Sequence, residues 1–116
     1  HLSGIAYIQA NNLSLSCEAD EGRGPVDFKI SRGQDITVIE VKLSSNGQYM
    51  HGYEVQVEEY AKAEQTENMV YVLVDVGNTR RMEKFINRYN RDIDERKIVP
   101  EVILIDSKSK KSASIT

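Results

Sequence analysis

The stretch 35–42, Asp-Ile-Thr-Val-Ile-Glu-Val-Lys, combines the β-branched, apolar pattern of a strand with two charged residues at its end. Residues two apart on a strand lie on the same face of a sheet, so Glu40 and Lys42 are predicted to point the same way. Burying a charge is costly unless it is paired or binds a metal. Glu40 and Lys42 are therefore either a solvated surface pair or part of a functional site.

A second carboxylate is predicted to lie opposite Glu40. The preceding stretch, 25–30, alternates apolar and charged residues as a half-buried strand does. If Gly33 and Gln34 form a two-residue hairpin loop, Asp27 pairs directly with Glu40. Directly opposed residues have Cβ atoms about 4.5–5.5 Å apart, where like charges repel. Two carboxylates so placed, with a lysine next along the face, are an arrangement that binds hard divalent cations.

The rest of the chain predicts further strands and helices in a mixed α/β order. The predicted strands cover 13–19, 25–30, 35–42, 69–76 and 101–106, and the predicted helices cover 52–65 and 80–96. The resulting order, β-β-β-α-β-α-β, predicts a mixed central sheet flanked by helices. Residues 1–12 contain apolar positions followed by a turn signal, which leaves helix and strand both open.

Length and composition predict a single domain over residues 1–107, followed by a polar, basic tail over 108–116. No apolar run approaches the roughly 20 residues of a membrane span, so no membrane association is expected. The single cysteine, Cys17, excludes multi-cysteine metal sites and fits a reducing, cytoplasmic location. The chain begins with His1 rather than Met, and we expect it to be excised from a longer protein.

The formal net charge of −3 does not favour nucleic-acid binding. Carboxylates that bind a metal contribute negative charge, however, and a bound cation offsets that charge. The net charge therefore counts against nucleic-acid binding but does not exclude it.

Three groups of residues on the predicted hairpin and on the helix after it resemble the PD-(D/E)XK nuclease superfamily, QxxxY subgroup: Gly24-Pro25-Val26-Asp27, Glu40-Val41-Lys42, and Gln56 with Tyr60. The resemblance covers roughly residues 14–76. It implies a restriction-endonuclease-like core and a deoxyribonuclease that depends on Mg²⁺ or Mn²⁺. An endonuclease in restriction, defence or repair is the expected role.

The same resemblance implies a set of metal ligands. Asp27 and Glu40 are expected to hold Mg²⁺ or Mn²⁺, with the backbone carbonyl of Val41 as a further ligand. The helix that usually begins the family core, which sometimes adds a carboxylate, is short or missing here. Glu18, on the polar face of the predicted strand 13–19, is a candidate substitute.

The resemblance also implies roles for the remaining residues. Lys42 is expected to orient the attacking water and to stabilise negative charge at phosphorus. Gln56 and Tyr60 are expected to support the site or to contact the substrate backbone. Phosphodiester hydrolysis independently requires a metal to polarise the phosphoryl oxygen, and cations where charge accumulates in the transition state.

Several alternatives stay open at the level of sequence. Gln56 and Tyr60 are equally compatible with a packed helix face. The basic residues of the second predicted helix either grip phosphates or form a solvated face: Arg80, Arg81, Arg88 and Arg91. The alternative function is a catalytically inactive module that binds nucleic acid or a protein partner. RNA as the substrate and a homodimer as the active form are also left open.

Overall fold

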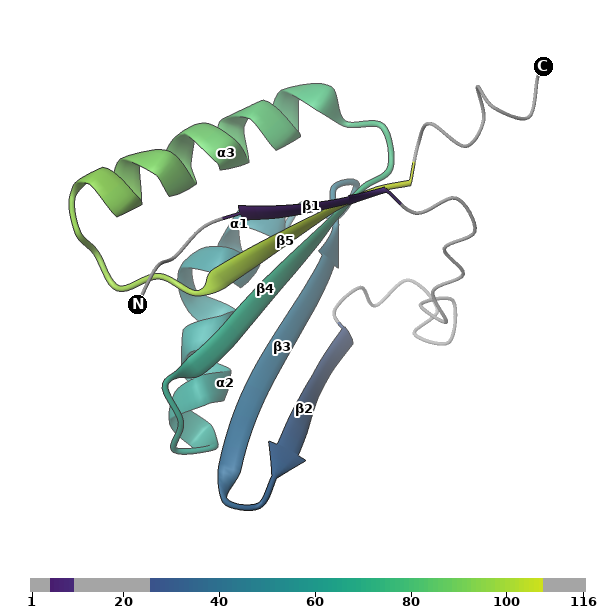
Figure 1. The fold of residues 1–116 in the computed structure, drawn as a ribbon. Coiled ribbons are helices and arrows are strands. Elements are labelled where there is room, and N and C mark those ends of the chain that lie inside the picture. The colour runs from purple at the N-terminus through teal and green to yellow at the C-terminus, as the bar shows by residue number, and fades with distance from the viewer. Residues whose placement is uncertain (1–4, 10–25, 108–116) are drawn as a thin grey trace.

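The computed structural model describes residues 5–9 and 26–107, and the side chains at positions 8, 9 and 26–28 lie outside that description. In chain order the elements are β1 (Ile5–Gln9), β2 (Val26–Arg32), β3 (Asp35–Leu43), α1 (Tyr49–His51), the π-helical turn η2 (Gly52–Gln56), α2 (Val57–Ala63), β4 (Asn68–Asp75), α3 (Thr79–Asp94) and β5 (Glu101–Asp106) (Figure 1).

The five strands form one mixed sheet in the order β1-β5-β4-β3-β2. Strands β2 and β3 pair antiparallel as a hairpin, whereas the β3–β4, β4–β5 and β1–β5 pairs are parallel. The predicted α/β class with a mixed sheet is therefore confirmed. Within residues 1–12, the described part is strand β1, and it lies at the sheet edge opposite to β2.

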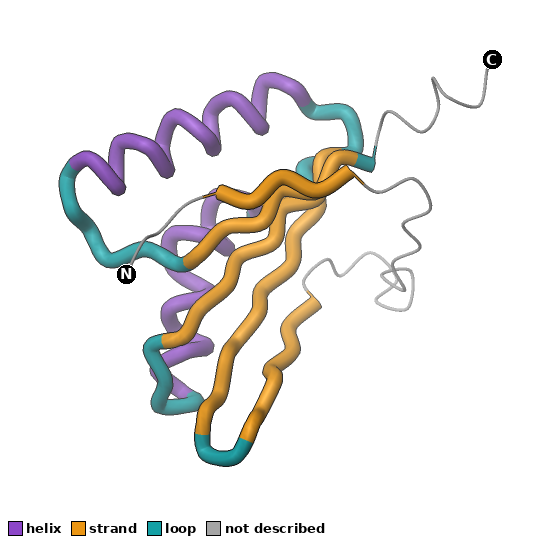
Figure 2. Tube along the Cα trace, viewed as in Figure 1, coloured by secondary structure: helices purple, strands orange, loops and turns teal. Residues whose placement is uncertain are grey.

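Both helical crossovers pack on the same face of the sheet, because β3, β4 and β5 follow one another in one direction and such connections are right-handed. Figure 2 shows the helices beside the twisted sheet. The core between them contains buried residues from both helical regions and two strands: Tyr49, Tyr53, Tyr71, Leu73, Met82, Phe85, Tyr89, Val102 and Leu104.

The other face of the sheet is also apolar. Val41, Val72 and Val74 are buried there, with partly buried isoleucine, leucine and valine side chains around them. Strands that are apolar on both faces are typical of parallel sheets. This explains why the sequence of β4 reads as a continuous apolar run.

The predicted elements lie close to the observed ones where the structure describes them. The first helical region begins at Tyr49 rather than at residue 52, and the long helix covers Thr79–Asp94 rather than 80–96. The predicted strand 13–19, which contains Glu18, and the tail 108–116 lie outside the described residues. None of the described helices is long and apolar enough to cross a membrane.

Candidate functional site

The β2–β3 hairpin has the register that the sequence predicts. Gly33 and Gln34 form the turn, with Gly33 at a φ of +63°, a backbone conformation that glycine adopts without steric cost. Asp27 and Glu40 are direct register partners. Only the backbone of Asp27 is described, so the hairpin establishes that positions 27 and 40 are paired. Glu40 lies two residues before Lys42 in β3.

Glu40 and Lys42 are a buried ion pair and not a solvated one. The Nζ atom of Lys42 lies 3.2 Å from Oε2 of Glu40, and the two side chains are 1% and 2% exposed. Their register partners in β4 are Leu73 and Tyr71, which belong to the core. The surface-pair interpretation is therefore wrong, and the cost of desolvating both charges must be offset by their interaction or by a function.

Lys42 lies directly under the helical region at Gly52. A Cβ atom added to Gly52 would stand 2.8 Å from Cε of Lys42 and 3.1 Å from the ring of Tyr71. Real Cβ atoms essentially never come as close as the first of these distances, and the second is shorter than most real Cβ contacts. Gly52 therefore allows the helix to approach the lysine closely enough to exclude water from the pair.

Replacing Gly52 with alanine is expected to destabilise the protein by about 1–3 kcal/mol, although alanine usually favours a helix by about 1 kcal/mol. The added methyl group overlaps Lys42 and Tyr71, both fully buried, so the overlap is not relieved into solvent. Urea unfolding of the two proteins measures the difference. Gly47→Ala is the matched control, because no atom lies within 4 Å of a Cβ placed there. Equal stability of Gly52→Ala and the parent protein would contradict the close approach.

The helical region and β3 align along their lengths. Lys42 packs beneath Gly52, and Val38 packs against Val57 on the same face of the strand. Glu40 lies between Val38 and Lys42 on that face, because alternate residues of a strand share a face. The segment η2 from Gly52 to Gln56 therefore lies over Glu40.

The π-helical turn η2 places Gly52 and Val57 on the same side of the helix, facing the sheet. The N–H of Val57 donates to the carbonyl of Gly52, a bond five residues back along the chain. The wider turn places Gly52 and Val57 one above the other, and both are buried against the sheet. Such turns are rare and often occur at functional sites, because they insert one extra residue into the helix.

Gln56 and Tyr60 have different environments. Oε1 of Gln56 is buried and has no hydrogen-bond donor within the described part of the chain. A buried acceptor without a donor costs about 1–3 kcal/mol. Tyr60 packs one turn further on, against Val38, Val57 and Ala61. Of the two predicted helix residues, only Gln56 therefore lies in the segment over Glu40.

Residues 1–78 match the model of DUF8371, which is described as a domain of unknown function. The chain belongs to the DUF8371 family. No curated protein and no solved structure matches this chain.

The match to DUF8371 includes the whole candidate site. Its residues 1–78 contain β1 to β4 with Asp27, Glu40, Lys42, Gln56 and Tyr60, whereas α3 and β5 lie beyond it. The hairpin and the helix over it are thus a feature of the part of the chain that matches the family.

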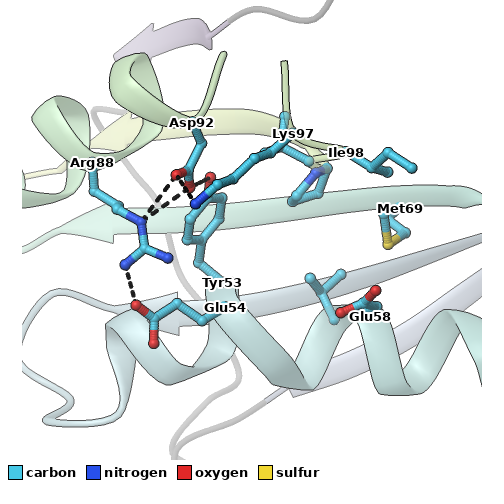
Figure 3. Close-up of a pocket in the computed structure, with 11 residues that line it drawn as sticks. Tyr53, Glu54, Glu58, Met69, Arg88, Asp92, Lys97 and Ile98 are labelled. Carbon is cyan, nitrogen blue, oxygen red and sulfur yellow. Dashed lines mark hydrogen bonds and ion pairs between the residues drawn. The ribbon is translucent and has the colours of Figure 1, made fainter. Parts of the chain in front are cut away.

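A second buried charged cluster was not predicted from the sequence. The carboxylate of Asp92, which is 3% exposed, accepts hydrogen bonds from Tyr53 at 2.7 Å and from Nε of Arg88 at 3.0 Å. Lys97 lies 3.6 Å away, and Arg88 also bridges to Glu54 (Figure 3). The sequence signal for this cluster is the Arg88–Asp92 spacing of four residues, which places both on one side of a helix.

The environment of Asp92 favours its charged form. Burial raises the pKa of Asp92, but the hydrogen bond from Tyr53 and the positive charges of Arg88 and Lys97 lower that pKa by more than burial raises it. The pKa of Asp92 therefore lies below its usual value. The same burial, together with the bond to Asp92, raises the pKa of Tyr53, so its hydroxyl keeps its proton.

The cluster borders a small cavity of about 140 Å³ between η2, α2, α3 and the loop before β5. Its charged lining residues are Glu54, Glu58, Asp92, Arg88 and Lys97. Because these charges are of both signs and largely neutralise one another by pairing, the cavity has no single electrostatic preference for a ligand. We assign the cluster to the stability of the helix packing.

Proposed function

We propose that this chain is a metal-dependent nuclease domain of the PD-(D/E)XK type, which hydrolyses phosphodiester bonds of DNA. The observation that carries the proposal is the β2–β3 register, which pairs Asp27 with Glu40 two residues before Lys42. A hairpin that continues through a helical crossover to a parallel strand is compatible with a restriction-endonuclease-like core.

The donor atoms at this place suit a hard divalent cation such as Mg²⁺ or Mn²⁺. Glu40 contributes a carboxylate, Asp27 is its register partner, and Oε1 of Gln56 is a buried acceptor that lacks a donor among the described residues. The described side chains alone contain no group of three or more His, Cys, Asp or Glu that could hold a metal. The proposed ligand set therefore depends on Asp27, with the backbone carbonyl of Val41 as a further donor.

When bound, Mg²⁺ supplies Lewis acidity and positive charge at the phosphoryl oxygen. Lys42 and Glu40 lie 3.2 Å apart in the closed pair. When the pair opens to solvent, the ammonium group of Lys42 would be within reach of a water molecule held by that carboxylate. Lys42 can therefore orient this water toward phosphorus and stabilise the negative charge that develops there. Gln56 would support the site from the helix side, and Tyr60 packs the helix against Val38 of β3.

DNA is the proposed substrate, and RNA is the alternative that the same chemistry allows. The resemblance favours an endonuclease of restriction, defence or repair. If both strands of a duplex are cut, two active sites are needed, and a homodimer supplies them.

A second function has a specific observation in its favour. Glu40 and Lys42 are almost completely buried, so in this conformation neither water nor a phosphodiester reaches them. A non-catalytic module that uses the fold to bind nucleic acid or a protein partner needs no such access. Cleavage separates the two functions, because only the nuclease requires the pair to open.

The purified chain is expected to nick or linearise plasmid DNA when Mg²⁺ or Mn²⁺ is present, and EDTA is expected to abolish cutting. Gel electrophoresis over time measures the rate. Asp27→Asn should lower that rate at least about a hundredfold, because it removes a proposed metal ligand. Asp35→Asn is the matched control, since this aspartate is exposed at the start of β3, the other strand of the same hairpin. Equal cutting by Asp27→Asn and the parent protein would reject the proposal, as would no cutting with either metal.

A further inference from the structure

Three cationic residues surround an open cavity at the start of α3. The cavity has a volume of about 620 Å³, and the described residues that line it include no carboxylate: Tyr49, Gly77, Asn78, Thr79, Arg80, Arg81 and Lys84. The whole chain has a formal net charge of −3. This basic surface, defined by Arg80, Arg81 and Lys84, is therefore a local reversal of the overall charge.

The cations of the basic surface are not neutralised by neighbouring carboxylates. Among the described residues, Arg80, Arg81 and Lys84 form no ion pair. Arg88, further along the same helix, instead lies within 3.0 Å of Asp92. The three charges around the cavity thus stay available to an external anion, whereas the charge of Arg88 does not.

The placement of these cations opposes the electrostatics of the helix. The first turn of α3 contains no acidic residue, and no side chain caps it. The side chain of Asn78, at the cap position, accepts a hydrogen bond from Ser44 instead. Cations in the first turn of a helix carry a free-energy cost, because they repel the positive end of the helix dipole, and this applies to Arg80 and Arg81. A bound anion would reverse this cost.

Arg81 is held in position before any ligand binds. Its Nη1 atom donates to the carbonyl of Ser44 at 2.8 Å, and its guanidinium lies 5.4 Å from the centre of the Tyr49 ring. Arg80 and Lys84 are exposed beside it. One positioned cation and two exposed ones suit a ligand with several negative charges, because little ordering of Arg81 is needed on binding.

The basic surface lies next to the candidate site. Ser44, which contacts both Asn78 and Arg81, follows Lys42 by two residues at the carboxyl end of β3. Tyr49, which lines the cavity, also accepts a hydrogen bond at its carbonyl from the hydroxyl of Tyr71. Ser44 and Tyr49 thus connect this surface to the strands that carry the Glu40–Lys42 pair and its neighbour Tyr71.

We propose that the basic surface binds the phosphodiester backbone of nucleic acid and so holds the substrate beside the site; this inference rests on the proposed function. The cavity is open, which suits an extended polyanion better than an enclosed phosphate ion. Arg80 and Lys84 are about 6 Å apart along the helix axis. That span is similar to the rise of two nucleotides in one strand of B-DNA, about 6.8 Å.

The test is fluorescence anisotropy of a labelled DNA duplex with the full chain in EDTA, so that binding is measured without cleavage. Arg80→Ala/Lys84→Ala is expected to weaken binding by roughly a hundredfold near 0.1 M salt, because each lost phosphate contact removes about one counterion release. The slope of log affinity against log salt should become shallower by about two. Arg32→Ala/Lys62→Ala also removes one arginine and one lysine, both from exposed positions outside α3, and should change neither value.

The outcomes separate this inference from the proposed function. Equal binding by Arg80→Ala/Lys84→Ala and the parent protein would overturn the basic surface, even if the chain cuts DNA. Displacement of the duplex by inorganic phosphate at an equal phosphate concentration would overturn it as well, in favour of a small-anion site. Binding that depends on Arg80 and Lys84 supports the surface, even if cleavage is never observed.

Discussion

Replacing Lys42 with methionine is expected to lower the free energy of unfolding by about 3–5 kcal/mol and to abolish metal-dependent cleavage. Methionine matches the length of the lysine stem, so the packing under Gly52 is largely kept. What is lost is the ammonium group 3.2 Å from Glu40, which is only 2% exposed. The carboxylate then stays in a dry environment without its positive partner.

The double variant Glu40→Leu/Lys42→Met shows why the pair is present. Replacing both members of a buried pair by apolar residues of similar size is often neutral or stabilising by about 1–4 kcal/mol. We therefore expect the double variant to regain the stability that Lys42→Met loses, and to remain inactive. A protein that is stable without the pair, yet does not cut, indicates that the pair is kept for chemistry.

Urea unfolding and the plasmid assay measure these two effects on the same samples. Lys62→Met is the matched control, because the side chain of Lys62 is 75% exposed and 3.9 Å from its partner Glu58. Such exposed pairs contribute about 0–1 kcal/mol. If Lys42→Met cuts DNA as fast as the parent protein, Lys42 has no catalytic role. If the double variant is as unstable as Lys42→Met, the pair is structural.

Replacing Asp92 with alanine is expected to destabilise the protein by about 3 kcal/mol, because two kinds of interaction are lost together. Hydrogen bonds to a charged group contribute about 1.5–3 kcal/mol, and a buried hydroxyl left without an acceptor costs about 1–3 kcal/mol. Asp92 joins Tyr53 of η2 to Arg88 of α3, so its loss also loosens the packing of the two helical regions. Asp94→Ala, which removes an exposed carboxylate of the same helix, should have little effect.

The carboxylate of Asp92 is also expected to make the free energy of unfolding depend on pH. The pKa of Asp92 is lower in the folded protein than in the unfolded chain, where it is about 3.9. Its contribution to stability is therefore complete above about pH 4 and is lost as the pH falls through the lower, folded-state pKa. Asp92→Asn should remove this part of the acid destabilisation. If unfolding curves of Asp92→Asn and the parent protein change equally below pH 4, the cluster does not control acid stability.

The local sequence pattern was sufficient to predict the β2–β3 hairpin and its register. A two-residue turn at Gly33-Gln34 between two strand-forming stretches determines the register, so the pairing of Asp27 with Glu40 followed from the sequence and is confirmed. The same holds for the two crossover helices and the strands after them, whose periodicity is strong. Strand β1 was ambiguous, because five residues contain too few repeats of either period to separate helix from strand.

Other features depend on contacts between residues far apart in the chain. Whether Glu40 and Lys42 meet solvent is decided by Gly52, whose missing side chain lets the helix cover them; a strand pattern cannot report this. Asp92 was missed for a related reason. Its partner Tyr53 lies on another helical region, and only the packing of α3 against η2 brings the two side chains together.

The sequence by itself determined the α/β order, the hairpin register and the choice of Asp27, Glu40 and Lys42 as the residues of chemical interest, because these follow from periodicity and turn chemistry within about 15 residues. Only the tertiary structure decided that the Glu40–Lys42 pair is buried and that the cations at the start of α3 stand around an open cavity. Burial and charge environment are set by which elements pack on which, and that depends on the whole sheet.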